Sequence, residues 1–405
     1  MPDNATILSP GSPTFTLAKS TFSIPWWNDL SPAVAAELVL SPVELLPPEH
    51  FDVVVIGAGV AGLSAALSAS QMGARVLVLE KEKRIGHGAT GRNAGILSAG
   101  INMSLAELPG NSEEAAFWPE TTQVLLSLVA EAARPGSLLK AHLTGALSLA
   151  ETASAARRLA REARARVALG LHAEIWTAAQ AAEATDGRLN VQSVVSALWL
   201  PIEGRIHPLT LLAHLARQVR DAGGRLAGCA QVRDYQTSHA NGQPNWQLTL
   251  TNGQWITTRG LIEATGPTAQ PNARIYALAF AADLPDHFPL FWDAAPYTYA
   301  DFRAGDGRLA ISGGRYGHAG VTKRDAIYHK RLANAARHWL PELADREPVA
   351  TWAVDLDVAA DMIPHLRKLK NVRSGLAIVG LGALGVLPGI ILGQRAGRTL
   401  MEQLT

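Results

Sequence analysis

The sequence predicts an α/β fold, because a buried strand, a glycine-rich turn, a helix and a second strand follow one another within about thirty residues. Residues 51–56 form a β-branched apolar run, as expected of a strand covered on both faces of a parallel sheet. Residues 63–73 continue as a helix of small side chains, and residues 75–80 form the next strand. The chain of 405 residues is long enough for a second domain beside this βαβ unit.

The turn of the βαβ unit carries three glycines in the pattern Gly57-Ala-Gly59-Val60-Ala-Gly62. Glycines at this spacing permit a tight turn, close approach of the backbone to a pyrophosphate, and close packing of the helix on the strand. Glu80 ends the second strand about twenty residues further on, where a carboxylate can accept hydrogen bonds from a ribose hydroxyl. We therefore predict dinucleotide binding. The alternative is a glycine turn that only packs a helix against a sheet.

The middle of the chain shows regular but weaker patterns. Apolar side chains recur with helical spacing over residues 113–133 and 152–169. Pro208 stands where a helix over residues 209–221 would begin. Asn252-Gly253 separates two strand-like runs and predicts a hairpin turn.

The two ends of the chain differ in composition. Residues 1–50 are rich in Pro and Ser and show no sustained periodicity, so we predict an N-terminal arm whose Trp26 and Trp27 pack on the main body. Residues 374–393 are uncharged and as long as a membrane span, but they contain recurring glycines and Pro388. These residues favour a buried strand, a glycine-rich loop and the start of a helix, so we expect no transmembrane span.

Composition and charge exclude several classes of protein. The formal net charge of +1 gives no electrostatic reason to expect a nucleic-acid partner. Cys229 is the single cysteine, so we expect neither an internal disulfide nor a metal site, and we interpret it as a buried core residue of a strand. No basic region precedes an apolar run at the N-terminus, and a cytoplasmic location fits best.

The segment after Glu80 distinguishes FAD from NAD. It contains Gly86-His87-Gly88-Ala-Thr-Gly-Arg92-Asn-Ala-Gly95, and it resembles the stretch that runs under the flavin in the D-amino-acid oxidase superfamily. That superfamily includes glycine oxidase, sarcosine oxidase and γ-glutamylputrescine oxidase. The resemblance extends over most of residues 51–400.

The resemblance implies a Rossmann-type FAD-binding domain assembled from residues 51–110, 200–270 and 367–405. It also implies a substrate domain, inserted between those segments from residues 111–199 and 271–366 and built on a mainly antiparallel sheet. The flavin is expected to be bound noncovalently. The residues that the motifs and the resemblance together assign to FAD are Gly57, Gly59, Val60, Gly62, Glu80, Lys81, Gly88, Thr90, Arg92, Asn93, Ala94, Gly95, Val232, Thr265, Gly266, Gly382 and Gly385.

The resemblance implies that a hydride moves to the flavin from the carbon next to an amine, which gives an imine. Glycine-oxidase-like members hold a substrate carboxylate with an arginine, and Leu356 stands at that position here, between Asp355 and Asp357. We therefore favour an amine or polyamine over an α-amino acid, unless Arg303 or Arg315 supplies the clamp. The further candidates for the substrate pocket are Tyr316 and His318.

Two other functions remain open at this point. One is an NAD-linked dehydrogenase, although that class does not explain residues 88–95. The other is a flavin-binding protein without turnover, because Leu381 and Leu384 stand where the family has aromatic and histidine residues. The sequence does not identify the amine, the electron acceptor, the oligomeric state or the role of the arm.

Overall fold

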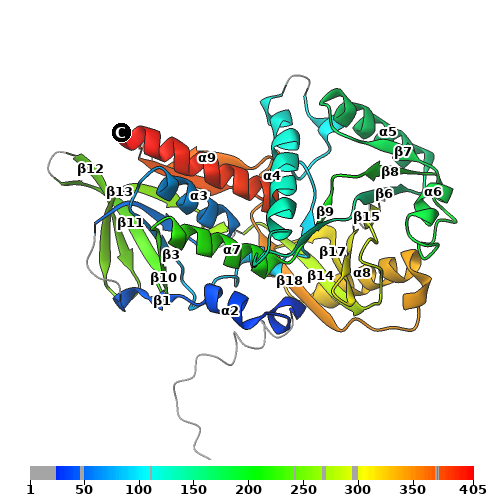
Figure 1. The fold of residues 1–405 in the computed structure, drawn as a ribbon, viewed down its shortest axis with the longest axis horizontal. Helices are drawn as coiled ribbons and strands as arrows, with labels where there is room; N and C mark the ends of the chain where they lie inside the picture. The colour runs from blue at the N-terminus through cyan, green and yellow to red at the C-terminus, as the bar shows by residue number, and fades with distance from the viewer. Residues whose placement is uncertain are drawn as a thin grey trace, which may run out of the picture.

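The computed structural model describes residues 24–45, 50–109, 112–240, 243–266, 271–293, 300–369, 372 and 374–405. Two large β-sheets lie in opposite halves of the molecule, with a long helix between them at the top of the view (Figure 1). That helix is α4, Phe117–Ala132.

The first sheet has nine strands, and its centre is parallel. Its main path runs in the order β1 (Ser41–Pro42), β10 (Arg225–Gly228), β3 (Val76–Leu79), β2 (Phe51–Ile56), β13 (Trp255–Glu263), β12 (Gln243–Leu250) and β11 (Val232–Ala240). β20 (Gly375–Val379) pairs in parallel with the end of β13, and β19 (His365–Lys368) pairs with β20. The strands and the hairpin expected from the sequence therefore form in this sheet, with Asn252 and Gly253 in the turn between β12 and β13.

Three helices pack around the parallel strands: α3 (Val60–Gln71), α7 (Pro208–Asp221) and α9 (Val386–Leu404). α9 lies close against α3 because glycines of α9 face its backbone. A Cβ added to Gly393 would lie 2.4 Å from the carbonyl oxygen of Ala61, and one added to Gly397 would lie 2.5 Å from that of Ala65. This close approach explains the glycines of the uncharged stretch, which forms a strand, a loop and a helix. In the described part of the chain, no helix is both long enough and apolar enough to cross a bilayer.

The second sheet has eight strands, all paired antiparallel except β15 with β6. Its order is β18 (Ala350–Leu356), β14 (Ala273–Ala281), β17 (Arg308–Gly317), β16 (Ala300–Gly305), β15 (Leu290–Asp293), β6 (Ala146–Ala150), β8 (Ser196–Leu200) and β7 (Glu174–Trp176). One face carries large apolar side chains such as Phe280, Phe291 and Phe302, which pack with Leu332 and Trp339 of α8 (Asp325–Trp339). The other face is turned toward the first sheet.

Smaller elements join the two halves. β4 (Ile96–Leu97), β9 (Gly204–Ile206) and β5 (Ala141–Leu143) form a three-stranded sheet. α5 (Ala153–Ala168) packs beside β6 and β8, and α6 (Ala178–Glu183) lies in the same half of the molecule.

Part of the segment expected as an arm is folded onto the body. Residues 24–45 include α2 (Pro32–Leu38), which begins where the Ser31 side chain accepts a hydrogen bond from the Val34 N–H. Trp26 is 1% exposed and packs edge-on against Trp352, which confirms the expected docking of the tryptophan pair. The helix was missed because it spans only two turns. Residues 1–23 and 46–49 lie outside the described residues.

Cys229 differs from its expected place in a buried strand. It follows the last residue of β10, has a φ of +53° and is exposed. Its backbone N–H donates to the carbonyl of Glu82. The strand ends one residue earlier than the apolar pattern indicated, so the thiol lies in the turn that follows.

Candidate active site

A cavity of about 370 Å³ lies between the two sheets, at the carboxyl ends of β2, β3 and β13. The residues that follow each of these strands line it, among them 57–61, 80–82 and 264–266. In parallel α/β sheets this edge is where ligands bind, because the turns there expose backbone N–H groups and helix N-termini. Most of the remaining lining residues come from the segment 86–98, the loop 380–387 and the inner face of the eight-stranded sheet.

The glycine turn after β2 has the shape that a bound pyrophosphate requires. Gly57 has a φ of +101°, and a Cβ there would lie 2.5 Å from the carbonyl oxygen of Ala264. A Cβ on Gly62 would lie 1.9 Å from the carbonyl oxygen of Gly57. Gly59 caps α3 without a side chain, so the N-terminus of the helix opens toward the cavity. The turn therefore fits the phosphates of a dinucleotide at a helix N-terminus.

Glu80 lies at the end of β3 with its carboxylate in the cavity wall. The carboxylate accepts hydrogen bonds from the backbone N–H of Ala58 (3.0 Å) and of Glu82 (3.2 Å). Burial raises the pKa of Glu80, and these two hydrogen bonds oppose that effect. The side chain is thus held beside the glycine turn, where a ribose would follow a pyrophosphate. Val232 lines the same end of the cavity.

The segment 86–95 crosses the cavity beside α3. The Thr90 hydroxyl accepts a hydrogen bond from the Val60 N–H (3.2 Å), which ties this segment to the start of the helix. Asn93 accepts from the Gly95 N–H and donates to the Thr90 carbonyl, and it fixes the turn in this way. Gly95 and Gly62 do not line the cavity; they allow two backbone segments to pass close behind it.

The loop 380–385 closes the cavity opposite the glycine turn, and two polar side chains hold it. Asn102 donates to the carbonyl of Leu381 (3.0 Å) and accepts from the N–H of Leu384 (2.9 Å). The Asp357 carboxylate accepts from the N–H of Gly380 (2.8 Å). Asp357 therefore lines the cavity, and its carboxylate orders the loop.

The other candidates for the substrate pocket do not line the cavity. Asp355 forms an ion pair with Arg274 (2.8 Å), which also pairs with Asp325. Arg303 is 2% exposed and pairs with Asp306 (2.8 Å). His318 is exposed beyond the end of β17, and the side chain of Arg315 lies outside the described residues.

Tyr316 lies near the cavity without lining it. It is 38% exposed, and its hydroxyl lies near the backbone N–H of Ala383 in the loop 380–385. Partial burial and the nearby carboxylate of Asp301 raise the pKa of Tyr316 to about 12.

Two polar residues of the cavity were missed by the sequence analysis: Asp301 of β16 and Ser312 of β17. They are direct cross-strand partners, and Ala277 of β14 and Trp292 of β15 continue the same row. Cross-strand partners share a face of the sheet. The signal available in the sequence was the alternation of polar and apolar residues, because Asp301 and Arg303 flank Phe302, which packs on the face toward α8. Using that signal required knowledge of which face of this strand meets the cofactor.

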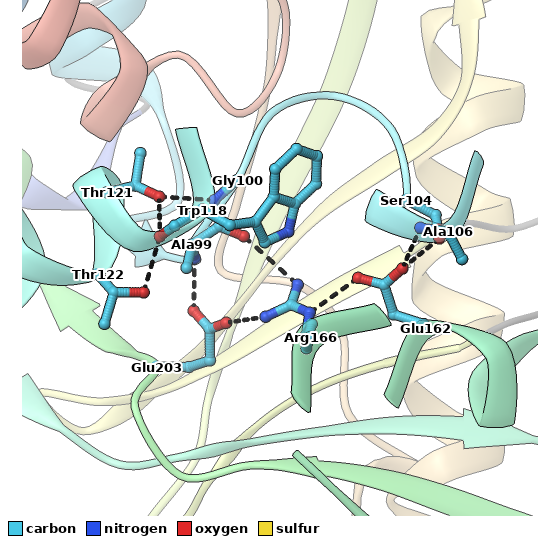
Figure 2. A network of polar contacts seen from close by, with 10 residues as sticks. All are labelled: Ala99, Gly100, Ser104, Ala106, Trp118, Thr121, Thr122, Glu162, Arg166 and Glu203. Atoms are coloured by element: carbon cyan, nitrogen blue, oxygen red, sulfur yellow. Dashed lines mark hydrogen bonds and ion pairs between the residues drawn. The ribbon is translucent and has the colours of Figure 1, made fainter. Parts of the chain in front are cut away.

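A buried ionic network fixes the segment that leads from the cavity toward Asn102 (Figure 2). Arg166 pairs with Glu162 (2.8 Å) and with Glu203 (3.1 Å). Glu203 also accepts a hydrogen bond from the Ala99 N–H (2.8 Å), and burial raises the pKa of Glu203 to about 7 against the opposing effect of Arg166. Ser98, which lines the cavity, hydrogen-bonds to the same carboxylate.

The match of the chain to known families agrees with this geometry. A model of the FAD dependent oxidoreductase family named DAO matches residues 52–398, and the chain belongs to that family. Its cofactor is FAD. In the described part of the chain, no group of three or more His, Cys, Asp and Glu side chains is arranged to hold a metal ion.

Several solved structures share the fold. A glycine oxidase from Geobacillus kaustophilus superposes with a TM-score of 0.75 at 21% identity, over 88% of this chain and 95% of that one. An L-proline dehydrogenase from P. horikoshii superposes with a TM-score of 0.74 at 18% identity, over 89% of this chain and 95% of that one.

Curated relatives match over shorter stretches. "Probable oxidoreductase OrdL" of Haemophilus influenzae is 49% identical over 59 residues, which are 15% of this chain and 14% of the relative. The mitochondrial L-2-hydroxyglutarate dehydrogenase of Arabidopsis thaliana is 32% identical over 111 residues, which are 26% of this chain and 22% of the relative. These matches thus span less than a quarter of either relative.

Proposed function

We propose that this FAD-dependent oxidoreductase oxidises a primary or secondary amine to an imine. An amine is supported best by the negative charge of Asp301. This residue lies on the inner face of the eight-stranded sheet and contributes its carboxylate to the cavity. Leu356, which occupies the expected place of an arginine clamp, also lines the cavity. A substrate carboxylate would meet like charge here, whereas an amine would not.

The cationic side chains among the described lining residues are those of Lys81 and Arg92, on the segment that follows β3. Burial lowers the pKa of Arg92, and the nearby carboxylates of Glu82 and Asp355 oppose that effect. Arg303 forms an ion pair with Asp306 and does not line the cavity. We therefore assign no carboxylate clamp to these arginines.

FAD, when bound, would accept a hydride from the carbon next to the amine nitrogen. The nitrogen loses a proton in the same oxidation, and water then converts the imine to a carbonyl compound with release of ammonia from a primary amine or of the smaller amine from a secondary one. The protein would position the substrate between the flavin and the sheet and would exclude bulk water with Ile275, Val354 and Leu356, which line the cavity.

The glycine turn, Glu80 and Val232 would hold the ADP half of FAD, and residues 88–95 and 380–385 would surround the flavin half. Binding would be noncovalent, since Cys229 is exposed and does not line the cavity. We further propose the division expected from the sequence: an FAD domain of residues 51–110, 200–270 and 367–405, and an inserted substrate domain of residues 111–199 and 271–366. The strands of the two large sheets fall largely on the two sides of that division.

An anaerobic absorbance titration tests the proposal. The FAD-loaded protein is mixed with monoamines, diamines, N-methyl amino acids, glycine, D-amino acids, L-proline and L-2-hydroxyglutarate. Bleaching of the flavin band by amines supports the proposal. Bleaching by amino acids or the hydroxy acid alone refutes the substrate class. Oxidised flavin that no compound bleaches favours a flavin-binding protein without turnover, and bleaching by NADH alone favours the nicotinamide-linked alternative.

A further inference from the structure

The Asp301 side chain is the unmatched charge of the substrate end of the cavity. Among the described residues, none forms a hydrogen bond or ion pair with its carboxylate, although it lines the cavity. Of the other acidic lining residues, Glu80 accepts two backbone hydrogen bonds, Asp357 accepts one, and Glu82 lies beyond β3 beside the glycine turn. A half-buried carboxylate in a cavity wall is costly to leave without a partner, so its presence here points to a ligand that supplies one.

The surroundings of Asp301 favour a cation. Asp293, on the neighbouring strand, adds a second negative charge, and burial together with this charge raises the pKa of Asp301 to about 7. Ser312 lies directly across from Asp301 and can donate or accept one further hydrogen bond. The titratable groups near Asp301 are Asp293 of β15 and Tyr316 at the end of β17, and neither lines the cavity. The local potential is therefore negative above pH 7.

The cation at Asp301 is not expected to be the nitrogen that is oxidised. Hydride loss from the adjacent carbon needs a neutral nitrogen with a free lone pair, whereas an ionised carboxylate in contact stabilises the protonated form. A second cationic group on the same substrate has no such conflict. The Asp301 carboxylate would also repel substrates that end in a carboxylate.

We propose that Asp301, assisted by Ser312, binds a cationic group of the substrate other than the reacting nitrogen, so that the preferred substrate is an α,ω-diamine or a polyamine. This inference rests on the proposed amine oxidation and names the substrate class within it. Asp301 is then a specificity-determining residue.

The test compares linear diamines of three to six carbons with monoamines of equal length. Anaerobic stopped-flow reduction of the FAD-loaded protein gives the Kd and the limiting rate for each compound. For the wild type we expect the best diamine to bind about 10- to 100-fold more tightly than its monoamine, as for a hydrogen bond to a charged group. In Asp301→Asn the ratio of the monoamine Kd to the diamine Kd should fall toward one. The ratio in the wild type should rise from pH 6 to pH 8, as Asp301 loses its proton.

Asp345→Asn is the control, since Asp345 is an exposed carboxylate that follows α8 and does not line the cavity. Its ratio should stay within about threefold of the wild type. A second measurement avoids turnover: 1,4-diguanidinobutane stays protonated and cannot react. It should raise the Tm of the oxidised FAD-loaded wild type and leave that of Asp301→Asn unchanged.

Three results would overturn the inference. Equal loss of the limiting rate for monoamines and diamines in Asp301→Asn would make Asp301 a proton acceptor for the reacting nitrogen. Equal Kd values for diamines and monoamines in the wild type would leave amine oxidation standing and remove the second cation site. Flavin that no amine reduces would refute both the inference and the function on which it rests.

Discussion

Replacement of Arg166 by methionine tests how much the buried network of Figure 2 contributes to stability. Arg166 bonds to Glu162 (2.8 Å), to Glu203 (3.1 Å) and to the Ala99 carbonyl (3.4 Å). The side chains of Glu162 and Glu203 are only 10% and 1% exposed, so removal of the guanidinium leaves two buried carboxylates without their cationic partner. Removing one partner of a buried ion pair costs about 3–5 kcal/mol, and we expect Arg166→Met to lose that much unfolding free energy.

The loss should depend on pH in a definite direction. Burial raises the pKa of Glu203 to about 7 from 4.5 even with Arg166 present, so the folded state holds more protons than the unfolded state between these values. Stability from this group therefore falls as pH rises through that window. Without Arg166 the pKa of Glu203 rises further. The cost of Arg166→Met should thus be larger at pH 8 than at pH 6, where Glu203 becomes neutral.

Urea unfolding followed by tryptophan fluorescence measures these changes at both pH values. The control is Arg164→Met on the same helix, which is exposed and should change stability by no more than about 0.5 kcal/mol. The double variant Arg166→Met with Glu203→Gln should recover part of the loss, because one stranded charge is gone. A loss in Arg166→Met equal to that of the control, or one independent of pH, would refute the reasoning.

Three further variants test the cofactor end. Gly62→Ala places a Cβ 1.9 Å from the Gly57 carbonyl oxygen, so we expect little folded protein. The control Gly88→Ala places a Cβ with no atom within 4 Å and should keep the wild-type unfolding midpoint. Equal unfolding midpoints for the two variants would contradict this prediction. Glu80→Gln should weaken FAD binding about 10- to 100-fold, because the variant loses a charged hydrogen-bond acceptor. Titration of the FAD-free protein, followed by flavin fluorescence, measures the Kd for FAD. An unchanged Kd would remove Glu80 from the site. Asn102→Ala leaves the loop 380–385 without two hydrogen bonds and should weaken FAD binding about tenfold in the same titration, with no effect expected if the loop is held by packing alone.

The central motif could be predicted because its signals are local. Gly57, Gly59 and Glu80 stand within one βαβ unit, and their roles depend on backbone conformations and distances that this unit fixes. The last strand, loop and helix were also predicted, since glycine and proline interrupt the uncharged stretch at short range. The short helix of residues 32–38 was not, because seven residues between prolines carry too few apolar positions to show a period.

The substrate end depended on contacts far apart in the sequence. Sequence position alone suggested Arg303 and Asp355 as pocket residues, yet both are paired with neighbouring charges and neither lines the cavity. Asp301 and Ser312 do line it, because the pairing of β16 with β17 places both side chains on the face of the sheet that borders the cavity.

The sequence by itself determined the α/β class, the FAD-binding turn and the family, since these rest on spacing within short segments. Only the tertiary structure decided which charges meet in the cavity. A shift of one residue in a strand exchanges the two faces of the sheet, so the register of β14, β16 and β17 selects which side chains face the substrate. That register is set by the packing of large apolar side chains on the opposite face against α8.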